Sequence, residues 1–191
     1  LIEFEFDKKL IKFNKIFCTS TPRRIVLLLD GLVDHADDKT VIRKGPKATS
    51  AFINDVPTNA ALGFANSLGI NVEDLEIKKS EKGDFVFGKK IEKGESTRSS
   101  LSSIIPKVIK NLQGPRFMKW GAGSFKFSRP IRWIVSIYND EILDFGFEEC
   151  DPIIAIGNKS KSHRLINKII KIDSPDNYFE LMEKNGVCLL Y

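Results

Sequence analysis

The sequence predicts an α+β fold in which a mixed, mostly antiparallel sheet is flanked by helices. Segments rich in β-favouring residues outnumber helical ones, and two of them, 75–94 and 131–148, contain turn signals that fold them into hairpins. Helical periodicity is confined to three segments, 57–69, 96–114 and 174–186. Hairpins separated by a few helices favour α+β over a doubly wound parallel sheet.

The first expected strand covers residues 24–34, because Ile25 to Leu29 form a continuous apolar run of the kind found in buried strands. Before it, Pro22 predicts an extended entry in which Arg23 and Arg24 point to opposite faces. One arginine would then pack inside while the other stays in solvent. Paired arginines are usually surface charge, yet their fork-shaped donors can also grip a carboxylate or phosphate.

Further strands are bounded by turn signals. Gly45-Pro46 predicts a plain turn within 41–52. Residues 82–84 would close the 75–94 hairpin, and Asn139-Asp140 would close the second hairpin. A closing strand is expected over 187–191.

Two of the helices carry start and stop signals. Thr58 is a suitable N-cap for the first, which Gly69 would end. Ser174 would cap the last helix, with Pro175 at its first helical position and Gly186 beyond its end.

The helix over 96–114 has the clearest amphipathic pattern, with an apolar stripe at helical spacing: Leu101, Ile104, Ile105, Val108, Ile109 and Leu112. Ser96 can cap its start. Pro106 lies inside it and predicts a kink or a missing hydrogen bond.

Composition suits one fairly large domain, or one domain with an appendage: 191 residues, 42% of them hydrophobic and 29% charged. The three cysteines, Cys18, Cys150 and Cys188, form no CxxC motif, which favours a reducing cytoplasm. No apolar run could span a bilayer, so no membrane association is expected. The first residue is not Met and the last residues end abruptly, which predicts a piece of a longer protein.

Positive charge is distributed unevenly. The net charge is only +5, yet residues 96–139 and 152–172 contain no acid and many lysines and arginines. We expect these two acid-poor segments to converge on one positive face that meets a polyanion.

Catalytic signals are weak. No phosphate-binding glycine loop is present, and Cys18 and Cys150 have no neighbouring base, which favours apolar packing over nucleophilic catalysis. His35, in "VDHADD", has no second histidine at ligand spacing, and His163, in "KSKSHRL", is either an exposed loop residue or a phosphate contact. We therefore predict no catalytic residue and no metal site.

The stretch "MKWGAGSFKFSRPIRW", residues 118–133, combines cations with aromatic side chains, as single-stranded nucleic-acid platforms do. Trp120, Phe125, Phe127 and Trp133 are therefore stacking candidates. The alternative is a structural crossover in which Phe127 and Trp133 are anchored in the core. In that interpretation the neighbouring cations line an outer face.

Eight motifs, in order, resemble the beta subunit of bacterial glycyl-tRNA synthetase: "TPRRIVLLLDGL", "VIRKGP", "AALGFANSLGI", "KGDFVF", "KGEST", "MKWG", "FSRPIRWIVSIYNDEIL" and "SHRL", between Thr21 and Leu165. Three departures accompany the resemblance. The family's Glu-Glu-Leu-Pro type motif is missing, Ser162 replaces a common glycine, and the carboxy-terminal HD-type and anticodon-binding regions are absent.

The resemblance implies that residues 1–191 are an amino-terminal domain of the beta subunit, similar to the editing-type domain of the phenylalanyl-tRNA synthetase beta chain. It implies a cytoplasmic ligase of two alpha and two beta chains, in which the alpha subunit uses ATP to activate glycine and this part needs no cofactor. Expected partners are the alpha subunit, tRNA(Gly) and the remainder of the beta chain. The alternatives are an editing-type hydrolytic domain acting on mischarged tRNA, or a pure protein-docking module marked by an exposed apolar patch.

Together with the charge pattern, the resemblance implies that the following residues contact RNA: Arg23, Arg24, Arg43, Lys44, Lys119, Lys126, Arg129, Arg132, Lys161, His163 and Arg164.

Overall fold

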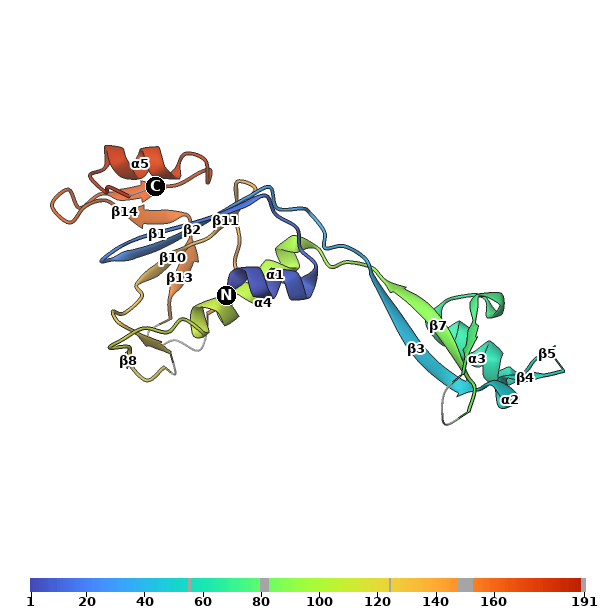
Figure 1. Cartoon of the computed structure of the whole chain (residues 1–191). Coiled ribbons are helices and arrows are strands. Elements are labelled where there is room, and N and C mark those ends of the chain that lie inside the picture. Colours follow the sequence, from blue (N-terminus) through green and yellow to red (C-terminus); the bar gives the residue numbers. More distant parts are fainter. Residues whose placement is uncertain (55, 80–82, 124, 148–152, 190–191) are drawn as a thin grey trace. The chain divides into compact units, whose positions relative to one another are not determined.

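The chain folds into two compact units, drawn in Figure 1. The computed structural model describes residues 1–54, 56–79, 83–123, 125–147 and 153–189. Unit 1 comprises Leu1–Ala36 and Glu95–Tyr191, and unit 2 comprises Asp37–Gly94. The α+β prediction is confirmed, with a correction. The described strands form several small sheets rather than one, and all but one of the pairings are antiparallel.

The described part of unit 1 contains the α-helices α1 (Ile2–Lys9), α4 (Thr97–Lys110) and α5 (Tyr178–Lys184). Its described strands are β1 (Lys15–Thr21), β2 (Arg24–Asp30), β8 (Met118–Lys119), β9 (Lys126–Phe127), β10 (Trp133–Val135), β11 (Ile137–Tyr138), β12 (Glu141–Ile142), β13 (Ala155–Gly157), β14 (Lys159–Lys161) and β15 (Ile169–Lys171).

Strands β1 and β2 form a hairpin closed by the two residues Pro22 and Arg23. The predicted extended entry is therefore wrong, because Pro22 lies in the turn. The prediction of a buried strand is also wrong: Val26 is buried, whereas Ile25 is 69% exposed. A two-stranded ribbon that packs on one face leaves its other face in solvent, so a continuous apolar run does not guarantee burial.

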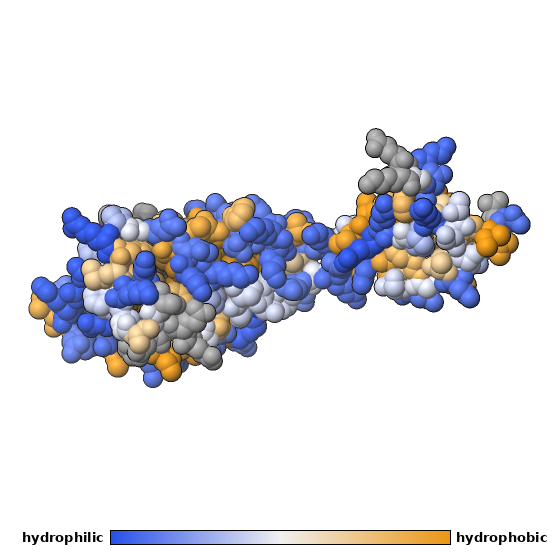
Figure 2. Space-filling view, turned by 90° about the horizontal axis from the view of Figure 1, so that it is seen from below, coloured by the Kyte–Doolittle hydropathy of each residue, from blue (hydrophilic) through white to orange (hydrophobic). Residues whose placement is uncertain are grey.

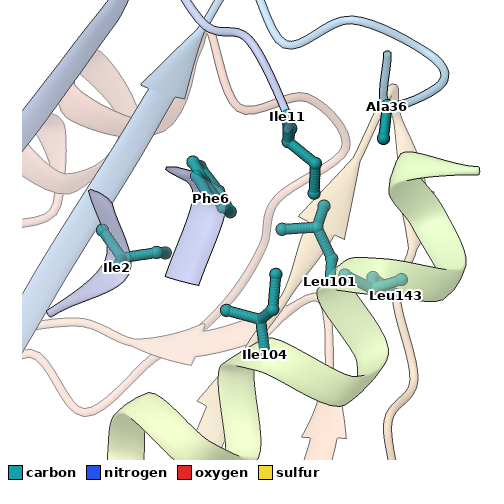
Figure 3. Close-up of a cluster of buried hydrophobic side chains, with 7 residues drawn as sticks. All are labelled: Ile2, Phe6, Ile11, Ala36, Leu101, Ile104 and Leu143. Atoms are coloured by element: carbon teal, nitrogen blue, oxygen red, sulfur yellow. The ribbon is translucent and has the colours of Figure 1, made fainter. Parts of the chain in front are cut away.

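One core cluster of unit 1 joins α1 to α4 (Figure 3). Ile2 and Phe6 of α1 face Leu101 and Ile104 of α4, and Ile11, Ala36 and Leu143 complete the cluster. The Ser96 hydroxyl accepts a hydrogen bond from the Ser99 N–H at 3.3 Å, which confirms the predicted cap. The helix continues through Pro106 as one element to Lys110.

The second core cluster packs α5 against β2 and β15, through Met182, Val26 and Ile170. The helix begins at Tyr178 rather than next to Ser174, because the Tyr178 N–H bonds to the Pro175 carbonyl and makes residues 175–177 a turn. The expected closing strand is not formed over 187–189. Val187 and Leu189 are buried by packing on α5, without a ladder partner.

The chain leaves and re-enters unit 1 at one place. The Ala36 N–H donates to the Glu95 carbonyl at 2.9 Å, and His35 forms an isolated bridge with Ser96. The Thr97 N–H donates to the Asp34 carbonyl at 2.8 Å. Unit 2 is therefore an insertion whose two ends are fixed side by side.

Unit 2 is built on a three-stranded antiparallel sheet of order β3-β7-β6. Its elements are β3 (Lys39–Lys47), α2 (Ala48–Ala51), β4 (Phe52–Ile53), β5 (Val56–Pro57), α3 (Asn59–Leu68), the 3₁₀ turn η1 (Val72–Asp74), β6 (Glu76–Lys78) and β7 (Phe85–Glu92). The antiparallel pairing of β6 with β7 confirms the predicted hairpin.

Gly45-Pro46 does not form the predicted turn. Strand β3 continues through it as a register shift between Lys44 and Lys47. A Cβ at Gly45 would lie 2.5 Å from the ring of Phe64. The glycine therefore permits close packing of α3 on the sheet.

Helix α3 has the predicted boundaries. The Thr58 Oγ1 accepts from the Ala60 N–H at 3.3 Å and donates to the Ser50 carbonyl at 2.7 Å, and Gly69 ends the helix with a φ of 69°. Among the described residues, no helix is long and apolar enough to cross a membrane.

Thr58→Ala is expected to destabilise unit 2 by about 1 kcal/mol, because it removes an N-cap and a link to Ser50. Hydrogen–deuterium exchange of the amides over 59–68 measures this loss. Thr58→Ser, which keeps the hydroxyl, is the control and should retain most of the protection. Equal protection in the alanine variant would show that the cap contributes nothing.

Candidate nucleic-acid interface

The two acid-poor segments meet in unit 1. Strand β10, from the first segment, pairs in parallel with β13, from the second. The Lys161 ammonium lies 5.5 Å from the centre of the Trp133 ring. The Arg24 guanidinium also reaches the second segment, where its Nη2 donates to the Lys161 carbonyl. The two segments are therefore adjacent in the fold, and the gathering of their cations on one positive face stays a prediction.

Beside this junction lies a groove of about 790 Å³, formed entirely within unit 1. The β1–β2 hairpin, the end of α4, the 127–135 segment and the residues before α5 supply its walls. Four arginines line it, Arg23, Arg24, Arg129 and Arg132, and no acid is among the described lining residues. We call this site the arginine groove.

The arginines differ in their surroundings. Arg23 is exposed in the hairpin turn, where its backbone N–H donates to Thr21 Oγ1 at 3.2 Å. Arg24 is half-buried, and its buried Nε has no acceptor in the described part of the chain. Arg129 and Arg132 are exposed. Within the described ranges none of the four forms an ion pair with a carboxylate.

Two other cations of the acid-poor segments are neutralised by a carboxylate. Arg98 pairs with Glu141 at 2.7 Å, and Lys171 pairs with Asp173 at 2.6 Å. Neither of these two neutralised cations lines the groove.

The rest of the groove lining is apolar or carries hydroxyl groups. Ile109 comes from the last turn of α4 and Leu112 follows the helix, and Ser160 and Tyr178 add hydroxyls. Burial raises the pKa of Tyr178 above its ordinary value, and the charge of Arg24 opposes this shift. The phenol therefore stays protonated at neutral pH and can donate a hydrogen bond. Neither Tyr178 nor Ser160 has a signal in the sequence that marks it as part of a site.

The β8–β9 hairpin presents two more predicted cations. Lys119 pairs in register with Lys126, and both are exposed. Phe125 and Phe127 are buried in a cluster with Phe147 and Ile154, so they are core residues and the stacking hypothesis is wrong for them. Trp120 is 37% exposed, and its Nε1 donates to the Phe127 carbonyl at 3.0 Å.

His163 and Arg164 are exposed in the turn between β14 and β15. The Nδ1 of His163 accepts from the Leu165 N–H at 3.4 Å. Neither residue lines the groove.

Arg43 and Lys44 belong to unit 2 and are not among the lining residues of the arginine groove. Arg43 lies 3.7 Å from Glu92, and the Lys44 ammonium lies 3.5 Å from the centre of the Phe85 ring.

Comparison with known proteins identifies one family. The model described as "Glycyl-tRNA synthetase beta subunit" matches residues 1–191. Relatives named "Glycine--tRNA ligase beta subunit" include one from Acaryochloris marina, 40% identical over 87% of this chain and 24% of the relative. Those from Trichodesmium erythraeum and Clostridioides difficile are each 38% identical over 96% of this chain and 26% of the relative.

The chain spans about a quarter of the length of these curated relatives. The matches extend over nearly the whole chain, beyond the motif series that begins at Thr21 and ends at Leu165. By this similarity the chain belongs to the glycyl-tRNA synthetase beta subunit family.

Proposed function

We propose that this chain is a non-catalytic part of a glycine–tRNA ligase and that the arginine groove contacts the backbone of tRNA(Gly). Its proposed protein partners are the alpha subunit and the remainder of the beta chain. ATP-dependent glycine activation is assigned to the alpha subunit, and no cofactor is proposed for this chain. One observation supports the proposal most directly: four arginines line one groove, and none of its described lining residues is an acid.

The chemistry of the groove suits a phosphodiester backbone. A guanidinium group donates two parallel hydrogen bonds to phosphate oxygens and stays charged at all physiological pH values. Apolar residues such as Ile109 and Leu112 line the same groove. The hydroxyl of Tyr178 adds a neutral donor.

The other predicted cations extend this surface in the proposal. Lys161 is linked to the groove through its carbonyl, which accepts from Arg24. Lys119 and Lys126 form an adjacent pair on one hairpin, and His163 and Arg164 form an exposed turn. The proposal assigns these five residues to weaker phosphate contacts, because none of them lines the groove.

Binding of tRNA(Gly) to the 191-residue chain is expected to weaken steeply with salt. If each groove arginine neutralises one phosphate, log K should fall with log[salt] with a slope of about −3 to −4. Filter binding over a salt series gives this slope. A slope near zero would remove the electrostatic contact from which the proposal starts.

The likeness of this region to the editing-type domain of the phenylalanyl-tRNA synthetase beta chain stays a prediction. The four guanidinium groups of the lining bind anions and do not activate water. Their chemistry therefore favours RNA contact over hydrolytic editing. That preference would be reversed if the chain deacylated mischarged tRNA and if log K for tRNA(Gly) binding did not fall with log[salt].

A further inference from the structure

Unit 2 carries a second surface, on the side of its sheet opposite to α3. We call it the outer face. The register places Ile42 and Lys44 of β3 on this side, opposite Lys89 and Phe87 of β7. It also places Glu76 and Lys78 of β6 there, opposite Phe87 and Phe85.

The other side of the same sheet is the packed one. Val86, between the two phenylalanines, is fully buried with Ala51 and Ala61. A Cβ on Gly88 would lie 2.3 Å from Leu68 of α3. Because side chains alternate along a strand, Phe85 and Phe87 point away from this core, and both are half-buried.

Lysines surround the two rings of the outer face. The Lys44 ammonium lies 3.5 Å from the centre of the Phe85 ring, and that of Lys78 lies 5.7 Å from the centre of the Phe87 ring. Lys89 is close by and pairs with Glu76 at 2.5 Å, and Lys78 pairs with the same carboxylate at 3.5 Å. On this face the described lysines outnumber the acid, and two ammonium groups already lie over ring faces.

Rings on a central antiparallel strand, about 7 Å apart and bordered by cations, suit one class of ligand. Each base of an unpaired nucleic-acid strand can stack on a ring face, while the phosphates between the bases meet the ammonium groups. A base-paired duplex cannot use the rings, because its bases are already stacked within the helix.

We propose that the outer face binds a single-stranded RNA segment by stacking successive bases on Phe85 and Phe87. On binding, the ammonium groups of Lys44 and Lys78 leave the ring faces and contact the phosphates between the bases. The site belongs to unit 2 and is independent of the arginine groove, so either site can exist without the other. Exposed apolar residues are visible on unit 2 among hydrophilic ones in Figure 2, and Ile42 and Ile91 are more than half exposed. A protein partner is therefore the competing occupant.

The test uses the 191-residue chain with Arg129→Glu/Arg132→Glu, which silences the groove. The probe is a fluorescein-labelled single-stranded RNA of about eight nucleotides, within the site size of a small stacking platform. Fluorescence anisotropy compares Phe85→Leu/Phe87→Leu with Phe85→Tyr/Phe87→Tyr. The leucine pair keeps apolar bulk but loses the ring faces, whereas the tyrosine pair retains them.

The leucine pair is expected to bind the probe at least about tenfold more weakly, and the tyrosine pair within about threefold of its parent. Ile42→Ser/Ile91→Ser tests the exposed apolar residues of the outer face for a protein partner, and Leu62→Ser, at an exposed position of α3 on the other side of the sheet, should leave probe binding unchanged. Circular dichroism and exchange protection of α3 verify that each variant is folded.

Three results would overturn the proposal. The leucine pair could bind the probe as tightly as its parent. A blunt RNA duplex of the same length could bind as tightly and respond equally to both pairs. The isoleucine variants could lose binding to the alpha subunit while the leucine pair still binds RNA, which would assign the face to a protein. A different result would contradict the groove proposal, namely an affinity for tRNA that does not change when Arg129 and Arg132 are replaced.

Discussion

Arg129→Glu/Arg132→Glu is expected to lower the affinity of the chain for tRNA(Gly) by at least about 100-fold at physiological salt. Each substitution removes a charge-assisted contact, worth about 1.5–3 kcal/mol, and each adds a repelling carboxylate to a groove lined by Arg23 and Arg24. The salt dependence should become shallower by about two phosphate contacts. Filter binding over the same salt series measures both effects.

Matched variants separate the groove from net charge. Lys8→Glu/Lys107→Glu reverses the same number of charges at exposed positions of α1 and α4 outside the groove lining. It should weaken binding by less than about threefold, since these charges are screened over a Debye length of about 8 Å. Arg129→Lys/Arg132→Lys keeps the charge but loses the planar fork, and we expect an intermediate affinity. Equal losses of affinity in the two double glutamate variants would show that net charge, and not the groove, determines tRNA binding.

Ile104→Ala is expected to destabilise unit 1 by about 2–5 kcal/mol, since it empties a fully buried position between α1 and α4. Phe6 and Leu101 border this position and cannot collapse into it without moving α1. Urea denaturation followed by tryptophan fluorescence reports unit 1 alone, because both tryptophans, Trp120 and Trp133, belong to it.

Ile169→Ala is the control for this change. It deletes the same atoms at a position of unit 1 that is 70% exposed, and it should cost less than about 0.5 kcal/mol. A loss of similar size in both variants would mean that the α1–α4 cluster contributes little to the stability of unit 1.

Local signals predicted the elements that depend on local chemistry. Helices α3 and α4 begin at the caps that Thr58 and Ser96 provide. The hairpin at Asn139-Asp140 forms because both residues adopt positive φ, 48° and 64°, which suits this dipeptide in a tight turn.

Elements decided by packing escaped prediction. In the first segment Ile2, Phe4 and Phe6 alternate as in a strand, yet they form helix α1, in which Ile2 and Phe6 are buried one turn apart and Phe4 is 60% exposed. The apolar run of β2 gave no sign that its partner would be β1 alone. At Ser174-Pro175 the start signals are present, but a turn precedes the helix.

The candidate site divides in the same way. Charge and composition were enough to select Arg129 and Arg132, since the absence of acids from 96–139 is a property of the sequence. Arg129 and Arg132 line one groove with Arg23 and Arg24 because the β1–β2 hairpin, distant in sequence, packs beside them and β10 pairs in parallel with β13. No short-range pattern encodes such long-range contacts, and the contribution of Tyr178 arises from them alone.

The bond between Ala36 and Glu95 has an evolutionary consequence. Because the two chain crossings are adjacent, a single recombination event can add or delete residues 37–94 without rearranging the host, as in domain insertions at tolerant sites. The ancestor of unit 1 could have bridged this gap with a tight turn. Homologues of different length at this junction would then show that unit 1, which carries the arginine groove, later gained unit 2 and its outer face.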